Sequence, residues 1–562
     1  MTAGLTVTGL TVGCGTRALV DRVGLEVAPG EVVALLGPAG SGKSLLLRAL
    51  AGLPPPGVWV EGAAALDGRA LTGGGEAPEN PGPGFVLIPE RASAALVQHR
   101  SLADLFAEAL AIGGHGTTIV PVLQQAASLL ERMGMTGASR RLALHPSDLS
   151  DGALWRAALA LALAAGPRLV LADAPADGLD PSVRAAMLDR LAVWARETGA
   201  ALLIAGRPDA GLDVAACRVL HLEHGRLVPE PQPRPRPVAA DAAPAGPPVL
   251  SVRDLAVSFP VGPTRMTVLE GAGFELAEGD TLALLGESGS GKSIFARALL
   301  RLVPASAGQV TWRGRDLLSC DDATMRGLRR EMQMLFPDAR SAFDPLRTIG
   351  DHIAESLAAL RPDIPKAERS TFVTNVLRKV GLPSSVADCR IGALTAAEAA
   401  RAALARALAP EPRLLVCDEP LSRLDGDDRA AFLDRLLELR RDEHLTLVYA
   451  TQDADQALRV GRRVLVMMTG RPVELAPAGT LPRDAHHPYT RAMLAAARAS
   501  GPFLDGDPVP AVLVRGGCGL RARCAKARPF CASSVPTLEP VGPGHRVSCH
   551  YWDLPDGHGD PG

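Results

Sequence analysis

Two segments of this chain have the residue types and spacing that bind nucleotide phosphates. Both fit the pattern G-x-x-x-x-G-K-[ST], in which backbone N–H groups surround the phosphates, the lysine contacts their oxygens and the final hydroxyl binds Mg²⁺. The sequence therefore predicts two nucleotide sites, with Ser44 and Ser293 as Mg²⁺ ligands. The first phosphate loop consists of Gly37, Pro38, Ala39, Gly40, Ser41, Gly42, Lys43 and Ser44, and the second of Gly286, Glu287, Ser288, Gly289, Ser290, Gly291, Lys292 and Ser293.

Each phosphate loop is followed, much further along the chain, by an apolar run that ends in an aspartate, Asp173 or Asp418. A carboxylate at the end of a buried strand is suited to hold Mg²⁺ beside a nucleotide, so we expect Asp418 to be a Mg²⁺ ligand and Asp173 to have the equivalent place. A glutamate directly after it is suited to orient or deprotonate the attacking water. Only the second run provides one, Glu419, because Ala174 stands at the matching position of the first.

The elements that must position these residues occur twice. Each phosphate loop follows an apolar run typical of a buried strand and opens a run typical of a helix, which places phosphate at a helix N-terminus. We expect domains at residues 1–230 and 249–475, a Pro/Ala-rich linker at 231–248, and a third region at 476–562 that is rich in Pro, Gly and Cys. The alternation of strand and helix predicts an α/β fold around a largely parallel sheet in each repeat.

Composition limits the classes of function. The chain has 562 residues, enough for more than one globular domain. A formal net charge of −2 gives no broad basic surface, so we expect no nucleic-acid partner. No apolar run has the length of a membrane span and the first residues lack a signal-peptide pattern, so we expect a soluble cytosolic chain with reduced cysteines.

The order of these parts resembles that of the ATP-binding cassette (ABC) ATPases, over both repeats nearly end to end. Before each Asp-terminated run lies a match to the family's signature segment, Leu-Ser-Asp-Gly-Ala at 149–153 and Leu-Thr-Ala-Ala-Glu at 394–398, and Asp180 and Asp425 follow the run. The resemblance implies two P-loop NTPase cassettes, each with a parallel-sheet core, an antiparallel β subdomain and a helical subdomain. It also implies head-to-tail pairing, with each ATP between one phosphate loop and the opposite signature segment.

Further motifs are similar to those of the peptide-importer ATPases. They are Arg-Glu-Met-Gln-Met-Leu-Phe at 330–336, Ser-Ala-Phe-Asp-Pro at 341–345, His-Pro-Tyr-Thr-Arg at 487–491 and a small cysteine-containing C-terminal extension. The resemblance implies an ATPase that lies peripherally on the cytoplasmic side of the inner membrane and powers uptake of peptides or nickel complexes. Its implied partners are two integral-membrane permease subunits and an extracytoplasmic substrate-binding protein, with ATP and Mg²⁺ bound and both cassettes supplied by one chain.

Several positions depart from the family pattern, and the two repeats depart unequally. The first signature segment keeps Ser150 and Gly152, whereas the second has lost the glycines that admit close backbone approach. Other substitutions affect both repeats. They are Gly206 and Gln452 at the switch-histidine position, and Pro89 and Pro337 at the position of the glutamine that senses Mg²⁺.

Head-to-tail pairing would make the two ATP sites different. One would join the first phosphate loop and Asp173 to the weakened segment at Thr395, and we expect binding without useful turnover there, because deleting a positioned base costs about 10²–10⁴ in rate. The other would join the second phosphate loop, Asp418 and Glu419 to the first signature segment. We expect Glu419 to act as the base and Gln452 to donate a hydrogen bond to the γ-phosphate. The sequence thus predicts one slow hydrolytic site and one structural site.

An adenine-stacking ring is expected in the second repeat alone. Phe259 stands where the family places that ring, whereas the first repeat has Gly13 in this region and no aromatic residue nearby. Stacking on adenine needs only a π-face, although a phenylalanine at a strand end also serves often as a core residue.

Four cysteines gather in a stretch of low apolar content within the third region. Four thiolates complete either an iron–sulfur or a Zn²⁺ site, but these spacings fit neither a zinc ribbon nor a bacterial ferredoxin run. The resemblance favours a [4Fe–4S] cluster, with Zn²⁺ as the second choice and free thiols as the third. His545 and His550 are further candidate Zn²⁺ ligands, although a histidine in such a place is more often solvated. The four cysteines are Cys518, Cys524, Cys531 and Cys549.

Two other classes of function stay open. Tandem-cassette translation factors and ribosome-recycling ATPases need a long charged linker or an N-terminal cysteine module, and this chain has a Pro-rich linker and C-terminal cysteines. A tandem protein that binds ATP with little turnover and acts as a regulator or scaffold agrees with the substitutions above. ATPase activity with and without the membrane subunits would separate that class from a transporter.

Overall fold

The chain forms two compact units, and each contains one of the repeats. One unit holds Met1–Arg234 and Ala495–Asp507, and the other holds Pro235–Leu494 and Pro508–Gly562. The sequence-predicted Ala39, Asp180 and Asp425 and nearly all of the linker lie outside the described residues. The computed structural model describes residues 4–15, 17–38, 40–72, 84–113, 119–135, 137–177, 179, 181–207, 212, 218–229, 246–261, 264–421, 424, 426–497, 504 and 516–554.

The first unit contains two sheets. The larger has the strand order β10-β9-β3-β8-β7-β6 and is parallel except for β10, which pairs antiparallel with β9. The smaller, in the order β2-β1-β4-β5, is antiparallel. The strands are β1 (Leu5–Cys14), β2 (Arg17–Val27), β3 (Val32–Leu36), β4 (Val58–Leu66), β5 (Arg69–Thr72), β6 (Phe85–Ile88), β7 (Leu169–Asp173), β8 (Ala201–Gly206), β9 (Arg218–Glu223) and β10 (Arg226–Val228).

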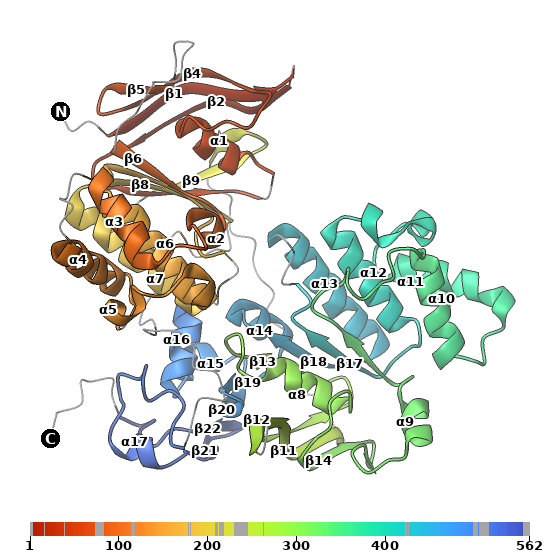
Figure 1. Ribbon diagram of the computed structural model, residues 1–562. Helices are drawn as coiled ribbons and strands as arrows, with labels where there is room; N and C mark the ends of the chain where they lie inside the picture. Colours follow the sequence, from red (N-terminus) through yellow and green to blue (C-terminus); the bar gives the residue numbers. More distant parts are fainter. Residues whose placement is uncertain are drawn as a thin grey trace. The chain divides into compact units, whose positions relative to one another are not determined.

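Helices cover both faces of the larger sheet of the first unit. Helix α1 lies between the two sheets, and α6 and α7 lie on the opposite face of the larger sheet, with α3 and α4 outside α6 (Figure 1). This arrangement is the predicted parallel core with an antiparallel and a helical subdomain. The helices are α1 (Lys43–Leu50), α2 (Ala92–Ala95), α3 (Leu102–Ile112), α4 (Ile119–Arg132), α5 (Ala138–Arg141), α6 (Asp151–Ala164) and α7 (Pro181–Thr198).

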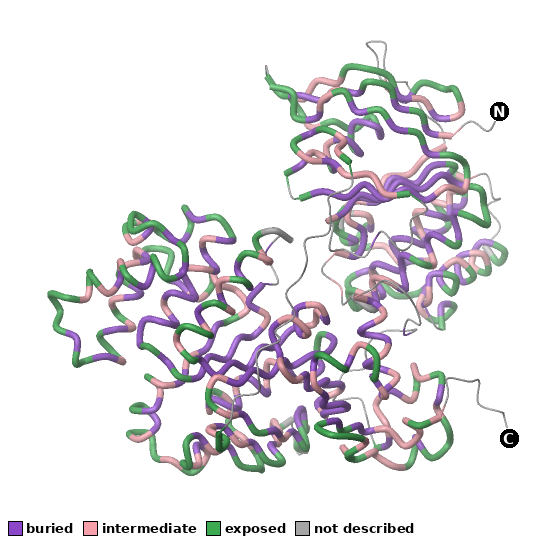
Figure 2. The backbone as a smooth tube through the Cα atoms, turned by 180° about the vertical axis from the view of Figure 1, so that it is seen from behind, coloured by how far each residue is buried: buried purple, intermediate pink, exposed green. Residues whose placement is uncertain are grey.

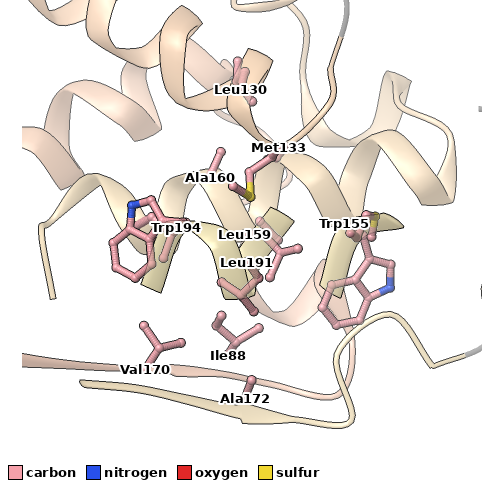
Figure 3. Packing of buried hydrophobic residues seen from close by; sticks show 14 of the residues in the cluster. Ile88, Leu130, Met133, Trp155, Leu159, Ala160, Val170, Ala172, Leu191 and Trp194 are labelled. Atoms are coloured by element: carbon pink, nitrogen blue, oxygen red, sulfur yellow. The ribbon is translucent and has the colours of Figure 1, made fainter. Parts of the chain in front are cut away.

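The apolar runs become strands that are buried on both faces (Figure 2). Because successive side chains of a strand point to opposite faces, Val33 and Leu35 join the cluster around α1, while Val32 and Ala34 join the cluster with the helical face. Figure 3 shows part of the second cluster. It labels Ile88, Leu130, Met133, Trp155, Leu159, Ala160, Val170, Ala172, Leu191 and Trp194.

The second unit repeats this plan and extends it. Its larger sheet has the order β16-β17-β18-β13-β19-β20-β22-β21. Neighbours among the first five strands in this order are parallel, and the pairs β19–β20, β20–β22 and β22–β21 are antiparallel. Its smaller sheet, β12-β11-β14-β15, is antiparallel. The strands are β11 (Pro248–Val261), β12 (Thr264–Ala277), β13 (Thr281–Leu285), β14 (Ala307–Trp312), β15 (Arg315–Asp316), β16 (Met332–Leu335), β17 (Leu414–Asp418), β18 (Thr446–Thr451), β19 (Arg463–Met468), β20 (Arg471–Pro477), β21 (Glu539–Gly542) and β22 (His545–Val547).

Helix α8 occupies in the second unit the place of α1 in the first (Figure 1). Local caps fix where several of these helices begin. For example, Thr348 and Asp351 form a reciprocal capping box at the start of α10. The helices are α8 (Lys292–Leu299), α9 (Asp322–Leu328), α10 (Ile349–Leu360), α11 (Arg369–Lys379), α12 (Ala396–Leu408), α13 (Gly426–Glu443), α14 (Ala454–Val460), α15 (Leu481–Asp484), α16 (Pro488–Ala497) and α17 (Phe530–Ser533).

Residues 516–554, called the C-terminal segment below, contribute the strands β21 and β22 to the second unit's larger sheet. Strand β22 pairs antiparallel with β20, where Glu474 is opposite Val547, and β21 pairs with β22. The expected boundary between residues 475 and 476 falls inside β20. The C-terminal segment and the second cassette therefore share one sheet.

Candidate nucleotide sites

The second phosphate loop is wrapped around its lysine. Lys292 Nζ donates to the carbonyl oxygens of Gly286 at 2.8 Å and Glu287 at 2.9 Å, and lies 3.3 Å from Glu419 Oε1. Gly291 makes the turn into α8 with a φ of 98°, a left-handed conformation that favours glycine. Lys292 becomes the first residue of α8, so the loop amides lie at a helix N-terminus.

The first phosphate loop has the same internal geometry. Lys43 Nζ donates to the carbonyl oxygens of Gly37 and Pro38, both at 2.7 Å, and to Ser41 Oγ at 3.0 Å. Gly42 precedes α1 with a φ of 102°. The described residues of the two loops therefore share a backbone shape suited to surround phosphate.

Each loop hydroxyl contacts the aspartate at the end of a buried strand. Ser44 Oγ donates to Asp173 Oδ1 at 2.8 Å, and Ser293 Oγ donates to Asp418 Oδ1 at 2.7 Å. Burial raises the pKa of both carboxyls above the usual range, and the serine hydrogen bonds oppose that rise. The second oxygen, Asp418 Oδ2, is buried, lies 3.7 Å from Arg297 Nη2 and accepts no hydrogen bond from the described residues. A serine oxygen beside an under-satisfied carboxylate is a donor set that fits Mg²⁺.

The position after each aspartate has the same backbone but a different side chain. Glu419 has a φ of 44° and Ala174 a φ of 45°, both in the left-handed region. Their amides donate to equivalent carbonyl oxygens, Ala450 at 2.9 Å and Ala205 at 2.8 Å. The carboxylate that could act as a base is therefore present beside the second phosphate loop, and the matching place beside the first holds a methyl group.

The substituted switch and glutamine positions lie at strand ends. Gly206 is the last residue of β8, and its carbonyl accepts from the Gly37 amide at 3.2 Å. Gln452 follows β18 and is half-buried. Pro89 directly follows β6, and Pro337 lies two residues after the end of β16. Both are at the carboxyl edge of their sheets. None of these prolines has a backbone N–H to donate.

The two signature segments begin helices but present different groups. Ser150 is the N-cap of α6, where its Oγ accepts from the Ala153 amide at 3.3 Å, and Gly152 lies in the first turn. Thr395 caps α12, and Glu398 Oε2 accepts from both the Thr395 amide at 2.8 Å and its hydroxyl at 2.9 Å. These hydrogen bonds lower the pKa of Glu398, so an anion occupies the N-terminus of α12. An anion at a helix N-terminus competes with phosphate. Helix α6 also has an acidic residue in its first turn, Asp151, so the two segments differ in the glycine and in the Thr395–Glu398 hydrogen bonds.

Beside Gly13 the structure places an aromatic ring that the sequence prediction missed. Gly13 in β1 is opposite Trp59 in β4, and the two lie so close that a Cβ on Gly13 would be 2.2 Å from Trp59 Cζ2. Phe259 is half-buried in β11 and packs against the adjacent apolar cluster. The prediction that no aromatic residue lies near Gly13 is thus wrong. Trp59 is distant from Gly13 in the sequence but lies beside it, because β1 and β4 pair in the sheet.

The four C-terminal cysteines line one cavity of about 20 Å³ in the second unit. Burial raises the pKa of Cys518 to about 11 and raises those of Cys524 and Cys549 as well. Among the described residues, no group of three or more Cys, His, Asp or Glu side chains has the geometry to hold a metal ion. The structure thus brings the thiols to one place without forming a ligand set.

The two histidines considered as metal ligands are engaged elsewhere. His545 is buried, and its Nε2 lies 2.7 Å from Glu474 Oε1, so the expectation that it is solvated is wrong. His550 lines the cysteine cavity but its Nε2 is 3.1 Å from the Ser534 carbonyl oxygen.

Comparison with known protein families places the chain. The family model described as "ABC transporter" matches it twice, at residues 20–177 and 269–422, and the two matches contain both phosphate loops. The chain belongs to the ABC transporter family. Its two units are two ABC cassettes, as the resemblance of the sequence implied.

Relatives of these ABC cassettes are transport ATP-binding proteins. The chain is 29% identical over 526 residues to the peptidoglycan transport ATP-binding protein YejF of Agrobacterium fabrum, covering 86% of this chain and 94% of that one. It is 34% identical over 319 residues to the oligopeptide transport ATP-binding protein OppF of Escherichia coli, covering 54% of this chain and 95% of that one. Among solved structures, the dimeric bacterial ABC transporter cassette MJ0796 matches with 23% identity and a TM-score of 0.38, over 41% of this chain and 98% of that one.

No helix within the described ranges combines the length and the apolar character that crossing a lipid bilayer requires.

Proposed function

We propose that this ABC protein is the ATP-hydrolysing component of a peptide-type importer, in which one cassette hydrolyses ATP and the other mainly holds it. One observation carries the asymmetry: Glu419 lies beside the second phosphate loop, and Ala174 has the same backbone position beside the first. Relatives that cover 86% and 54% of the chain are named as peptidoglycan and oligopeptide transport proteins, which supports peptides or related compounds as the cargo. Nickel or other metal complexes are the second class of cargo implied by the sequence resemblance.

At the second phosphate loop, the chain's residues would divide the work of hydrolysis. Lys292 would leave Glu419 and the loop carbonyls for the phosphate oxygens of ATP. Glu419 would take the proton of the water that attacks the γ-phosphorus as the bond to the bridging oxygen breaks, and Gln452 would donate to the γ-phosphate. Ser293 and Asp418 would hold Mg²⁺, which neutralises charge that develops on the phosphate oxygens.

At the first phosphate loop, Lys43, Ser44 and Asp173 would bind ATP and Mg²⁺ without a base. In head-to-tail pairing within the chain, this loop would face the α12 terminus, where Thr395 and Glu398 bond to each other and the glycines of the segment are absent. The second loop would face Ser150 and Gly152. The better signature segment thus serves the loop that has the base.

The proposed partners are two integral-membrane permease subunits and an extracytoplasmic substrate-binding protein. The chain would lie on the cytoplasmic face of the inner membrane and transmit ATP binding to the permeases. Support comes from the peptide-transport names of its relatives. We propose no nucleic-acid partner, in agreement with a net charge of −2.

We also propose the four cysteines as ligands of a [4Fe–4S] cluster, with Zn²⁺ as the alternative. Their convergence on one cavity supports a four-thiolate site, while the raised pKa values mean that a metal would have to displace protons from the thiols. Iron, sulfide and zinc analysis of protein purified without oxygen decides between them. Stoichiometric zinc without iron would remove the cluster, and neither metal would leave free thiols.

Turnover by three variants tests the asymmetry. We expect Glu419→Gln to lower kcat by about 10²-fold or more, as removal of a positioned base does. Lys43→Ala should cost much less turnover, because it weakens binding at the site that hydrolyses little, and Ala174→Gln should leave kcat unchanged. Equal losses in Glu419→Gln and Lys43→Ala would contradict the proposal. Activity should rise when the permease subunits are co-expressed, and a chain that stays inactive with them would instead be a regulator or scaffold.

A further inference from the structure

The second phosphate loop is bonded to the C-terminal segment through a buried ion pair. Arg523 Nη1 donates to Glu287 Oε2 and Nη2 donates to Oε1, both at 2.8 Å. The side chains are 6% and 3% exposed, respectively. Glu287 is the second residue of the phosphate loop, and Arg523 lies 236 residues later, next to Cys524. The Arg523–Glu287 ion pair is bidentate, the geometry in which arginine binds carboxylate most strongly.

The backbone of Glu287 is held as firmly as its side chain. Its amide donates to Tyr489 Oη at 2.7 Å, and Tyr489 is fully buried. Its carbonyl oxygen accepts from Lys292 Nζ at 2.9 Å. Thus the residue next to Gly286 is bonded at its amide, its carbonyl and its carboxylate, and two of the three partners come from outside the cassette's family-matched residues 269–422.

The carboxylate of Glu287 is unexpected in a loop that binds the negatively charged phosphates of a nucleotide. Like charges at short range oppose binding, and the opposition grows as water is excluded. The first phosphate loop avoids the difficulty, since Pro38 stands where Glu287 does. In the second loop Arg523 supplies the compensating cation, and it does so from a buried position where solvent screening is weak.

We propose that Arg523 and Tyr489 are positioning residues for ATP at the second phosphate loop. Arg523 neutralises Glu287, and Tyr489 fixes the loop amide that precedes the phosphate-binding glycines. The C-terminal segment is therefore part of the nucleotide site of the cassette that hydrolyses. The inference rests on the proposed assignment of the second phosphate loop as a nucleotide site.

Nucleotide titration of the full chain tests the proposal. Fluorescent ATP is titrated into proteins that all carry Lys43→Ala, so that the second loop reports alone. We expect Arg523→Met to raise Kd about tenfold or more, because it leaves a buried anion beside the phosphates. Arg523→Lys should raise Kd less, and Glu287→Gln should lower it, because the variant removes the anion and leaves the cation of Arg523. The double variant Glu287→Gln/Arg523→Met should return Kd to within about threefold of the parent, because no anion remains to be neutralised.

The controls separate charge compensation from a general loss of structure. Arg521→Met changes an arginine of the same segment that donates to the Gly516 and Cys518 carbonyl oxygens instead of the loop, and should leave Kd unchanged. A purely structural role for Arg523 predicts a lower melting temperature without rescue of Kd in the double variant, and that result would overturn the proposal. If Arg523→Met does not fold, Glu287→Gln decides, since a weaker affinity than the parent's would contradict charge compensation.

Failure of the underlying site assignment would look different. In that case adding Lys292→Ala to the Lys43→Ala parent would not change the titration at all. If Lys292→Ala abolishes binding but Arg523→Met leaves Kd unchanged, only the role of Arg523 is refuted. Tyr489→Phe should raise Kd severalfold, because the Glu287 amide loses its acceptor.

Discussion

At the scale of single residues, the two cassettes differ where side chains do chemistry and agree where the backbone is shaped for it. Ala174 keeps the positive φ of Glu419 although a methyl group has no use for it. Non-glycine residues in this conformation are strained by roughly 1 kcal/mol. In Glu419 that strain positions a carboxylate. In Ala174 the same strained backbone positions only a methyl group, which cannot act as a base.

The strain at Ala174 predicts the effect of a substitution. We expect Ala174→Gly to raise the free energy of unfolding of the first cassette by about 0.5–1 kcal/mol, because glycine adopts a φ of 45° without a Cβ clash. The nearby Ala172→Gly in buried β7 should lower the free energy of unfolding by about 1 kcal/mol, because glycine loses more conformational freedom than alanine when a strand forms. Urea unfolding of both variants measures the difference, and a destabilised Ala174→Gly would contradict the argument.

The anion at α12 predicts a second effect at this scale. Glu398→Gln keeps an acceptor for the Thr395 amide and removes the charge. If α12 faces the first phosphate loop, ATP affinity there should increase several fold, as removal of a like charge near phosphate does. Binding is measured in a Lys292→Ala background, and Glu368→Gln, a change at the start of α11, is the control for a general change of charge. An unchanged affinity in Glu398→Gln would argue against this pairing.

At the scale of elements, the sequence predicts the strands that are apolar from end to end and misses those that depend on distant partners. Runs such as Val32–Leu36 and Leu414–Asp418 are strands because their residues are buried on both faces. The short β21 and β22 contain Pro, Gly and charged residues, so no local pattern indicated them. Likewise the phosphate loops follow from their motif, whereas the Arg523–Glu287 pair and the position of Trp59 depend on packing between distant segments.

Strand β22 is held to the sheet by a buried histidine–carboxylate pair that predicts a pH effect. Burial favours a raised pKa for Glu474, but the hydrogen bonds from His545 and the His486 amide outweigh it and lower the pKa below 4.5. A lowered carboxyl pKa contributes stability above the unfolded-state value, and that stability is lost as pH falls through the folded-state value.

We therefore expect the second cassette to lose stability below about pH 4.5 in a way that Glu474→Ala does not. At pH 7 the variant should be less stable by about 3–5 kcal/mol, the usual cost of removing one partner of a buried pair. Urea unfolding at pH 7 and pH 4 measures both effects. Equal pH dependence of the two proteins would show that Glu474 does not couple to folding.

At the scale of the whole molecule, the proposed pairing of two cassettes within one chain would not depend on protein concentration. Two cassettes joined by a linker meet at an effective concentration that does not depend on the amount of protein. A chain with a slow hydrolytic site would also stay closed for longer on each ATP.

This arrangement predicts ATP-dependent closure within a monomer. In Glu419→Gln, Mg²⁺ and ATP should reduce the radius of gyration measured by X-ray scattering while the mass stays near 58.4 kDa. Adding Lys292→Ala should abolish the change. A doubled mass with ATP would show instead that cassettes from two chains pair with each other.

The pairing of β20 with β22 also bears on how this protein is made. A ribosome completes β20 well before it reaches β22, so for that interval one side of β20 offers unpaired N–H and C=O groups, a known template for wrong pairing. Translation interrupted before residues 545–547 would leave that edge open in every product. The sheet thus closes only after β22 has been synthesised, and chaperones or proteases that recognise open strand edges would meet chains in which β22 has not yet been made or has not yet paired.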